Sequence, residues 1–357
     1  MHNFLFVLPA GGYSGGANSV VQEVRGLRRI GINANIAVDQ RNIASFRKCY
    51  STEFDILQDI LSFKSYKELE IHLEKYDFVI ATVSTHASEL FSTVRNVNNK
   101  SNKQIQIGYY IQDCEPLFFQ PGSPDWMLAK LSYDDAKDVI CFAKTDWICR
   151  VVEQNHSIKV RRVQPSVDHD CYSPNLGVRE NISISAMLRT GTARRAPRRT
   201  ARILNRVKEK YKDAVEIFVF GSSDDEILEN GIILNSGIQN QGRLTRDQVA
   251  QSLRDSSLFL DLSDYQAFGR TGIESMACGA IPVMPILGGA SEFIKHGQNG
   301  YLVDTRVDDL VIDIIDEFVS LPAKRRISMK VSANELAAEF SVHRSAVSLS
   351  KIIINNI

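Results

Sequence analysis

The chain has 357 residues, of which 44% are hydrophobic, and its 42 basic residues balance 42 acidic residues. This length suits about two domains of ~150 residues each, and the balanced charge argues against nucleic acid as a partner. No apolar run reaches the ~18 residues of a spanning helix, and the start of the chain lacks the basic segment of a secretory signal. The six cysteines show no paired spacing, which fits reduced thiols, so we expect a cytoplasmic protein.

The first half of the chain alternates short apolar runs with longer amphipathic segments, which is the pattern of a parallel sheet with crossover helices. Apolar side chains at helical spacing predict a helix over residues 16–30. We therefore expect a Rossmann-like domain over residues 1–165. Its predicted strands are residues 4–8, 32–38, 77–82, 106–111, 139–142 and 160–163, and its further helices are 65–75 and 86–97.

A connector that contains Pro and Ser, residues 164–174, separates this half from a second alternation of strands and helices. We expect a second Rossmann-like domain over residues 175–339, with helical structure throughout from residue 306 onward. Its predicted strands are residues 182–187, 215–220, 231–234, 258–262 and 281–284, and its predicted helices are 197–210, 245–254 and 271–278, the last of them ended by Gly279.

The stretch 257–285 points most directly to a function, because a strand-like run leads there into a short helix. Gly269 and Gly272 lie at this turn, where unpaired backbone N–H groups and the helix dipole favour a phosphate group. Gln266 and Glu274 flank the turn on its two sides. A carboxylate does not attract phosphates, so we expect Glu274 to bind neutral hydroxyl groups beside them, on a ribose or another sugar.

This stretch resembles the signature of retaining, GT-B-fold glycosyltransferases of family 4, in which two Glu residues separated by seven positions precede Ala-Cys-Gly and Pro-Val. Glu274, Met-Ala-Cys-Gly at 276–279 and Pro-Val at 282–283 match, and Gln266 replaces the first Glu. The resemblance implies an α/β protein of GT-B fold, with two Rossmann-like domains that face each other across a cleft. It also implies that the C-terminal helix, within about residues 340–357, packs back on the first domain. The implied reaction moves a hexosyl unit from a nucleoside diphosphate sugar with retention, without a cofactor or an essential metal.

The resemblance assigns three groups of residues to the donor's diphosphate. Arg189 ends the first strand of the second half and matches a family Arg, while Arg194 or Arg195, preferably Arg195, stands in for a family Lys. Guanidinium groups suit phosphate oxygens and stabilise charge on the leaving diphosphate. The glycine-rich first loop is expected to contact the same group through Gly15 and Gly16. The strand-to-helix turn contributes Phe268, Gly269, Arg270, Thr271 and Glu274.

Residues 112–116, Gln-Asp-Cys-Glu-Pro, resemble the rhamnosyltransferase-type branch of the family, in which Gln-Asp-x-Glu-Pro recurs. We expect Gln112 and Asp113 to hydrogen-bond the transferred sugar or the acceptor hydroxyl. The expected donor is dTDP-L-rhamnose, and the expected acceptor is a growing or lipid-linked glycan of a cell-surface polysaccharide such as O-antigen. We expect a peripheral contact with the inner face of the membrane, where arginines outside the site can touch anionic lipid. The expected catalytic residues are Arg189, Arg195, Gln266, Glu274 and Asp113.

Alternative interpretations stay open at this stage. The same chemistry can use a UDP-hexose or GDP-mannose as the donor. Gln in place of the first Glu fits either an altered specificity or a non-catalytic nucleotide- or glycan-binding module. A nicotinamide oxidoreductase is disfavoured, because the first loop lacks the Gly-x-Gly-x-x-Gly fingerprint. Asp168-His169-Asp170 imitates a metal-binding motif, but its place in the connector argues for a structural role.

Overall fold

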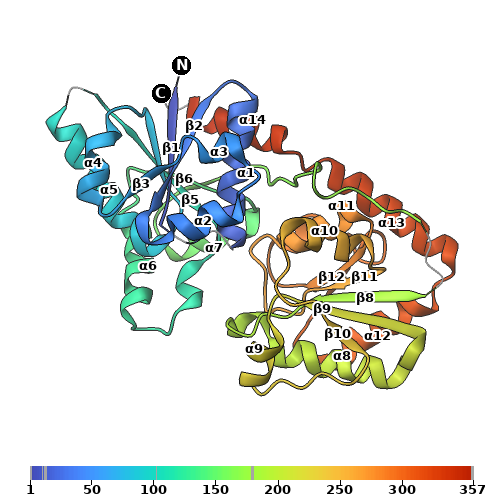
Figure 1. Ribbon diagram of the computed structural model, residues 1–357. Coiled ribbons are helices and arrows are strands. Elements are labelled where there is room, and N and C mark those ends of the chain that lie inside the picture. Colours follow the sequence, from blue (N-terminus) through green and yellow to red (C-terminus); the bar gives the residue numbers. More distant parts are fainter. Residues whose placement is uncertain (1, 10, 12–13, 102, 178–180, 355–357) are drawn as a thin grey trace. The chain divides into compact units, whose positions relative to one another are not determined.

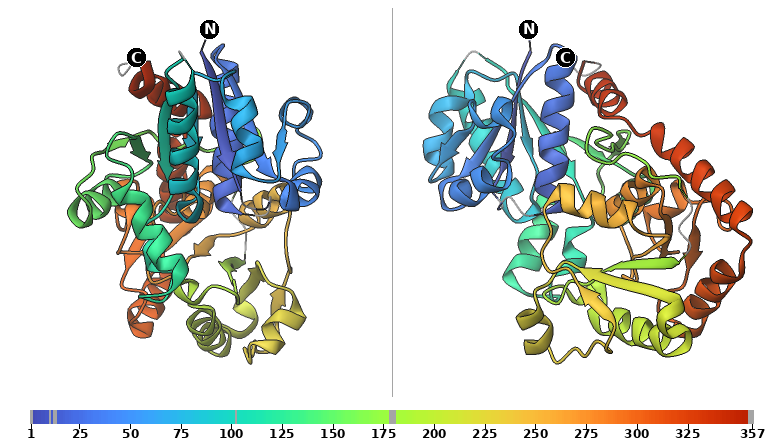
Figure 2. Two further views of the ribbon diagram at one scale, coloured as in Figure 1. Left: turned by 90° about the vertical axis from the view of Figure 1, so that its left-hand side faces the viewer. Right: turned by 45° about the vertical axis from the view of Figure 1, so that its right-hand side comes forward.

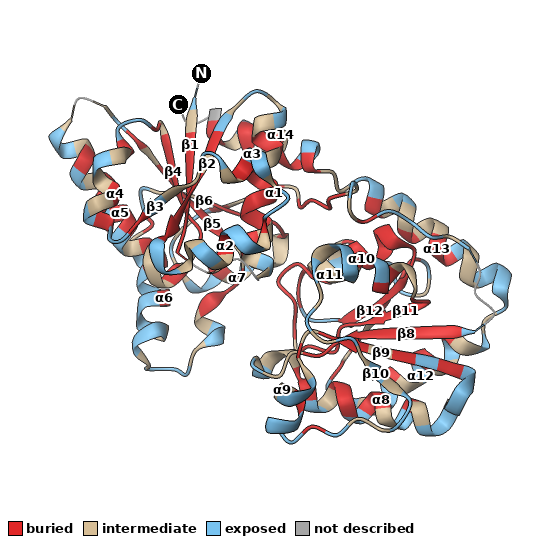
Figure 3. Cartoon of the chain, viewed as in Figure 1, coloured by how far each residue is buried: buried red, intermediate tan, exposed pale blue. Residues whose placement is uncertain are grey.

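The computed structural model describes residues 2–9, 11, 14–101, 103–177 and 181–354, and the chain divides into two compact units (Figure 1). Unit 1 comprises Met1–Ser166 with Ser341–Ile357, and unit 2 comprises Val167–Phe340. Each unit has one parallel β-sheet with helices on both of its faces (Figure 2). The strands are mostly buried, and the exposed residues lie on the outer faces of the helices and on loops (Figure 3).

Unit 1 contains a seven-stranded sheet in the order β3-β2-β1-β4-β5-β6-β7. The order reverses between β1 and β4, which is the arrangement of a doubly wound fold. The strands are β1 (Asn3–Leu8), β2 (Asn33–Asp39), β3 (Leu61–Phe63), β4 (Phe78–Ala81), β5 (Gln106–Ile111), β6 (Ile140–Ala143) and β7 (Val160–Arg162). The helices are α1 (Gly15–Arg29), α2 (Ile43–Cys49), α3 (Phe54–Leu57), α4 (Tyr66–Leu73), α5 (Ser84–Lys100), α6 (Pro124–Asp134), α7 (Asp146–Asn155) and α14 (Val342–Ile354).

The last helix, α14, completes the core of unit 1. Its apolar side chains join the same buried cluster as strands β1 and β2 and helix α1. Gly26 of α1 allows the close contact, since a Cβ atom there would lie 2.9 Å from the Val342 carbonyl oxygen. A buried ion pair adds to it, in which Lys144 Nζ lies 2.6 Å from Glu23 Oε1. The hydroxyl of Ser345, on α14, hydrogen-bonds both of these side chains.

Unit 2 contains a six-stranded parallel sheet in the order β10-β9-β8-β11-β12-β13. Here the order reverses between β8 and β11. The strands are β8 (Ile182–Met187), β9 (Val215–Phe220), β10 (Ile238–Asn240), β11 (Leu258–Leu260), β12 (Ile281–Pro285) and β13 (Tyr301–Val303). The helices are α8 (Pro197–Tyr211), α9 (Asp224–Glu229), α10 (Arg246–Arg254), α11 (Arg270–Cys278), α12 (Asp308–Ser320) and α13 (Ala323–Ala338).

The strand predicted at residues 231–234 is wrong, and the edge strand is β10, a few residues later. The apolar run there packs on α8 instead of extending the sheet. Asn205 of α8 donates a hydrogen bond to the Ile233 carbonyl at 2.9 Å and accepts one from the Asn235 amide at 2.8 Å. A helix side chain therefore satisfies the backbone groups that a strand would pair with β9.

Candidate functional site

The loops after β8 and β11 lie at the point where the strand order of unit 2 reverses. Open α/β sheets bind ligands at the carboxyl ends of the strands at such a point. Arg189 follows β8, Asp261 follows β11, and helix α11 begins soon afterwards. The sequence-predicted residues of unit 2 therefore lie on segments that meet at this edge.

The N-terminus of α11 has the geometry expected of an anion-binding turn. Gly269 precedes the helix with φ of 85°, and no side chain caps the helix there. Among the described residues, the Thr271 amide has no hydrogen-bond partner. Both glycines of the turn are needed for space, because a Cβ atom at Gly269 or Gly272 would lie 2.6 or 2.7 Å from the side chain of Met284.

Arg189 is half-buried, and its guanidinium makes no hydrogen bond or ion pair with any residue that the structure describes. Burial lowers its pKa, and Asp261 offsets this effect only in part. Arg194 and Arg243 lie near enough to lower the pKa further by charge repulsion. A cation held in this way has unused donors, which suit a phosphate group.

Asp261 joins two of the predicted residues. Its carboxylate, 4% exposed, lies 3.4 Å from Arg195 Nη1 and accepts a hydrogen bond from Gln266 Nε2 at 2.5 Å. The main chain of Gln266 is fixed as well, because its carbonyl accepts a hydrogen bond from the Gly289 amide at 2.9 Å. Gly288 has φ of 120°, and a Cβ atom there would lie 2.0 Å from the Gln266 carbonyl oxygen, so only glycine fits.

Glu274 is more enclosed than the sequence indicates, with only 5% of the residue exposed. Burial raises the pKa of its carboxyl group from 4.5 to about 7, while Arg270 and Arg246 lower it in part. Tyr172, from the connector between the two alternations, lies near the same carboxyl group and also lowers its pKa in part. The connector therefore builds part of the surroundings of the predicted hydroxyl-binding residue.

Two other predicted residues of unit 2, Arg194 and Phe268, make ring contacts. The guanidinium of Arg194 lies 5.1 Å from the ring centre of Tyr265, and not against Asp261 as Arg195 does. Phe268 is buried, with its ring 5.6 Å from that of Phe293. A ligand at the turn can therefore meet Phe268 through its main chain only.

In unit 1, the predicted residues lie at the start of α1 and at the end of β5. Ser14 caps α1 by accepting a hydrogen bond from the Ala17 amide, while Ala10, Gly12 and Tyr13 of the glycine-rich loop lie outside the described residues. Gly16 lies against Gln112, because a Cβ atom at Gly16 would be 3.1 Å from Gln112 Oε1, whereas a Cβ atom at Gly15 would meet none of the described residues within 4 Å.

The loop that carries Gln112 and Asp113 is anchored at its two ends. Gln112 Nε2 donates a hydrogen bond to the Thr82 carbonyl, and Asp113 Oδ1 accepts one from the amide of the next residue. Glu115 accepts a hydrogen bond from the Ser84 amide at 2.9 Å, at the start of α5. Burial raises the pKa of the Glu115 carboxyl group to about 7, against the lowering effect of the Ser84 hydrogen bonds.

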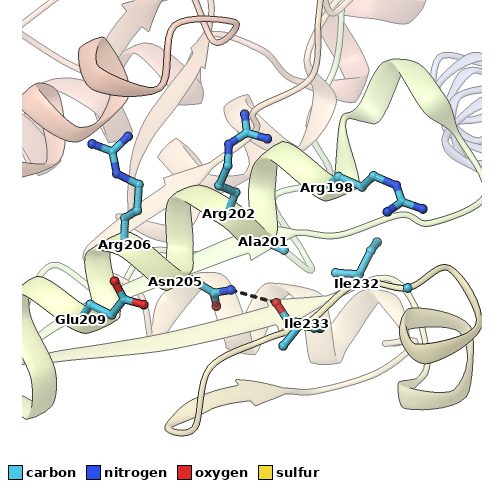
Figure 4. Close-up of a pocket in the computed structure, with 9 residues that line it drawn as sticks. Arg198, Ala201, Arg202, Asn205, Arg206, Glu209, Ile232 and Ile233 are labelled. Atoms are coloured by element: carbon cyan, nitrogen blue, oxygen red, sulfur yellow. Dashed lines mark hydrogen bonds between the residues drawn. The ribbon is translucent and has the colours of Figure 1, made fainter.

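A surface cavity of about 320 Å³ on α8 is lined by Arg198, Arg202 and Arg206 (Figure 4). Arg202 pairs with Asp308, and Arg206 pairs with Asp309. Arg198 donates a hydrogen bond to a backbone carbonyl. Since these side chains already have partners, the cavity is a weaker candidate for phosphate than the edge at Arg189.

No group of three or more His, Cys, Asp or Glu side chains in the described part of the chain could hold a metal ion. In the connector, Asp168 forms an ion pair with Arg246. None of the helices in the described ranges is long and apolar enough to span a membrane.

Sequence reasoning missed Asp261 and Tyr172 as parts of the site. Asp261 lies within an apolar strand-like run, so its position after β11 was the only available signal. Tyr172 lies far from Glu274 along the chain, and no local pattern links the two.

Residues 187–335 match the family described as glycosyl transferases group 1. This part of the chain, which lies within unit 2, is similar to a group 1 glycosyl transferase domain. It contains the predicted residues of unit 2, from Arg189 to Glu274. Gly15, Gly16 and Asp113 lie in unit 1, outside the matched range.

One curated relative is the N-acetyl-alpha-D-glucosaminyl L-malate synthase of Bacillus anthracis, 38% identical over 76 residues. That match covers 20% of this chain and 20% of the relative, so the chain matches only about a fifth of that relative's length.

The solved structures resemble the chain over its whole length. Anabaena HepE, in complex with UDP and glucose, is 15% identical to this chain with a TM-score of 0.78. The match covers 99% of this chain and 100% of the HepE chain. A TarM variant of S. aureus, in complex with UDP, fondaparinux and alpha-GlcNAc-glycerol, is 12% identical with a TM-score of 0.77, covering 99% of each chain. At such low identity the likeness concerns the fold, and it confirms the predicted GT-B class.

Proposed function

We propose that the protein is a retaining glycosyltransferase that moves a hexosyl unit from a nucleoside diphosphate sugar to a glycan. The observation that carries this proposal is Arg189, a half-buried guanidinium without a partner among the described residues, at the switch point of the group 1 domain. Such a cation has the charge and the donors to bind a diphosphate.

In this proposal the diphosphate lies against Arg189, Arg195 and the amide groups at the start of α11. Charge develops on the leaving diphosphate in the transition state, and fixed cations stabilise it there. Arg195 is held by Asp261, so its guanidinium needs little rearrangement when the donor binds. On the resemblance, Gly15 and Gly16 are assigned to the diphosphate as well, and no metal is required for this role.

The hydroxyl groups of the donor are assigned to Glu274 and Gln266, and Asp113 is assigned to the transferred sugar or to the acceptor hydroxyl. The acceptor attacks the same face from which the diphosphate leaves. The leaving phosphate oxygen takes the proton of the acceptor hydroxyl, so no side chain has to act as a base. Exclusion of water from the reacting carbon suppresses hydrolysis of the donor.

We propose dTDP-L-rhamnose as the donor, on the resemblance of residues 112–116 to the rhamnosyltransferase-type branch. A UDP-hexose is the second candidate, because the similar HepE and TarM proteins were both crystallised with UDP. The two candidates differ in the sugar, in the 2′-hydroxyl of the ribose and in the base, and the same diphosphate site serves both.

We propose a glycan acceptor that is lipid-linked, with peripheral contact between the protein and the inner face of the membrane. The support is a group of exposed apolar side chains on one segment of unit 1. This segment also has an exposed lysine, Lys130, as interfacial helices do. The apolar residues are Leu117, Phe118, Met127, Leu128 and Leu131.

The test is incubation of the protein with dTDP-L-rhamnose, UDP-glucose, UDP-galactose and GDP-mannose, together with a glycan acceptor fraction. Released nucleotide is measured, and the anomeric configuration of the product is read by NMR. We expect turnover with dTDP-L-rhamnose and an unchanged anomeric configuration. Turnover with a UDP-hexose alone would replace the donor, inversion would refute the mechanism, and no turnover on any donor would refute the enzymatic function.

A further inference from the structure

The buried pair of Asp261 and Gln266 has a hydrogen-bond pattern that fixes the orientation of the Gln266 amide. Both residues are buried, at 3% and 5% exposed. Asp261 Oδ1 accepts hydrogen bonds from the Ser263 amide and hydroxyl, and Asp261 Oδ2 accepts them from Gln266 and Arg195. The carboxylate therefore has about as many donors as it can accept.

The Gln266 amide uses its donors inside the protein. Nε2 donates to Asp261 Oδ2 at 2.5 Å and to the Ser263 hydroxyl at 3.1 Å, which accounts for its two N–H groups. Oε1 has no hydrogen-bond partner among the residues that the structure describes. The side chain thus offers one acceptor atom, and it cannot flip without setting a carbonyl oxygen against the Asp261 carboxylate.

The same contact favours Gln over Glu at position 266. A carboxylate at position 266 would lie within hydrogen-bond distance of the buried carboxylate of Asp261. Two carboxylates at this distance cannot both be ionised at little cost, and one of them would retain a proton. A neutral amide keeps an oxygen acceptor at position 266 and places the negative charge at position 261.

We propose that Asp261 is a positioning residue for catalysis, which locks the Gln266 amide so that Oε1 accepts a hydrogen bond from a hydroxyl of the transferred sugar. The inference rests on the proposed function, because it requires a sugar nucleotide at this edge of unit 2. Asp261 itself does not touch the sugar. It also holds Arg195, whose guanidinium is assigned to the diphosphate.

Substitutions of Asp261 and Gln266 are expected to have different effects when they are made singly and together. In Asp261→Asn, an N–H group of the side chain at position 261 faces the N–H groups of Gln266. Two donors cannot hydrogen-bond each other, so the Gln266 amide turns its N–H groups toward the sugar. In Gln266→Glu, the two carboxylates repel each other. In the double variant, the side-chain amide at position 261 donates to one oxygen of the new carboxylate, and the second oxygen replaces Oε1 as the acceptor.

The experiment compares the two single variants, the double variant and the control Gln298→Glu, which makes the same chemical change at an exposed position. Thermal unfolding is measured at pH 5.5 and pH 8, as ~2.5 units of pH span the range in which paired carboxylates titrate. We expect Gln266→Glu to lower the Tm at pH 8 by about 5 °C or more, and by less at pH 5.5. The double variant and the control should unfold within about 2 °C of the wild type.

Kinetics are measured with dTDP-L-rhamnose and with UDP-glucose, and binding is measured with dTDP and UDP. We expect kcat/KM to fall by at least about tenfold in each single variant at pH 8, and to return to within about fivefold of the wild type in the double variant. Gln266→Glu should regain activity as the pH is lowered. Binding of the free nucleotide should stay unchanged in Gln266→Glu, because the contact of Gln266 is to the sugar, whereas Asp261→Asn also removes the ion pair of Arg195 and should weaken nucleotide binding.

Additive effects of the two substitutions on Tm and kcat/KM would overturn the proposal, and so would a Tm loss in Gln266→Glu that does not depend on pH. The positioning role would also be overturned if the effects of the two substitutions on Tm were not additive but kcat/KM of Asp261→Asn equalled that of the wild type. If the wild type turns over neither donor, the proposed function and the sugar contact fail together, while the Tm coupling still decides whether the pair is built as described.

Discussion

Among the single residues of the site, Arg189 and Glu274 carry the strongest electrostatic signals. Both are placed where burial opposes their charged forms, since it lowers the pKa of Arg189 and raises that of Glu274. Groups held at such a cost are typical of functional sites. Their costs to stability and their expected gains for activity can be measured separately.

Replacement of Arg189 by Ala is expected to lower turnover of the nucleotide sugar by about two orders of magnitude or more. Stability should not fall, because Arg189 makes no bond to the described residues and its burial is unfavourable. The measurement is nucleotide release together with urea unfolding. The control is Arg198→Ala, an exposed arginine of α8, which should keep turnover within about twofold. Equal losses in the two variants would count against the diphosphate assignment.

Glu274 predicts a pH dependence of stability. Its folded pKa of about 7 lies above the unfolded value of 4.5, so the folded form binds the extra proton between these values. The contribution is therefore full below about pH 4.5 and is lost as the pH rises to about 7, which amounts to about 3 kcal/mol.

The measurement is the free energy of unfolding of the wild type and of Glu274→Gln at several pH values between 4.5 and 7.5, followed by circular dichroism. The pH range is set by the two pKa values of the group. We expect this part of the pH dependence to disappear in the variant. Parallel curves for the two proteins would show that Glu274 is not buried as the structure describes.

At this scale, Arg189, Gln266 and Glu274 could be predicted as site residues because each occupies a fixed place relative to a strand end or a helix start. The direct partner of Gln266 could not be predicted. The bond to Asp261 depends on how two loops fold over each other, and neither loop has a pattern that specifies it.

Helices α1 and α11 each begin after the end of a strand and carry predicted site residues at or near their first turn. At Gly15, the first residue of helix α1, a Cβ atom would meet none of the described residues within 4 Å. At Gly16, the second residue, a Cβ atom would lie against Gln112. Packing therefore restricts the side chain at position 16 but does not restrict the side chain at position 15.

Replacement of Gly15 by Ala should leave stability unchanged or raise it by up to ~1 kcal/mol, because Ala favours helix and its Cβ atom meets no described residue within 4 Å. The KM for the nucleotide sugar should rise severalfold if the main chain there approaches the diphosphate. Unfolding and donor kinetics are measured on the same preparation. An unchanged KM would remove Gly15 from the site and leave the loop a structural turn.

At the scale of elements, period and turn signals predicted the central strands and the long helices well, since β5, β8 and β9 have the predicted bounds and α14 lies within the range expected for the C-terminal helix. The failures are at the sheet edges. Strands β3, β10 and β13, of three residues each, were not predicted, although the equally short edge strand β7 was, and at 231–234 an apolar run packs on α8 instead of joining the sheet.

At the scale of the whole chain, the return of the last helix to unit 1 depends on a buried ion pair. Lys144 and Glu23 have side chains that are 5% and 0% exposed, and Ser345 of α14 bonds to both. Removal of one partner leaves an uncompensated buried charge. We therefore expect this cluster to contribute strongly to the stability of unit 1.

Replacement of Lys144 by Met should destabilise unit 1 by about 3–5 kcal/mol. The control is Lys100→Met, whose exposed ion pair with Glu70 should contribute at most about 1 kcal/mol. Both tryptophans, Trp126 and Trp147, lie in unit 1, so their fluorescence reports its unfolding in urea. Equal urea midpoints for the two variants would contradict the burial of this pair.

At this largest scale, the alternation of strands and helices was enough to predict two Rossmann-like domains, and the motif at 266–283 was enough to predict the GT-B fold. The identity of the sugar is a different matter. It depends on single hydrogen bonds in loops, such as the one expected from Gln266 Oε1, and a sequence pattern does not specify those contacts.

The proposed function requires that the edge of the unit 2 sheet around Arg189 binds the diphosphate of a sugar nucleotide. The most direct test is a calorimetric titration of the wild type and of Arg189→Ala with dTDP-L-rhamnose, UDP-glucose and GDP-mannose. We predict that the wild type binds at least one of them and that Arg189→Ala binds it at least about tenfold more weakly. No binding at millimolar concentration, or equal binding by the two proteins, would contradict the account.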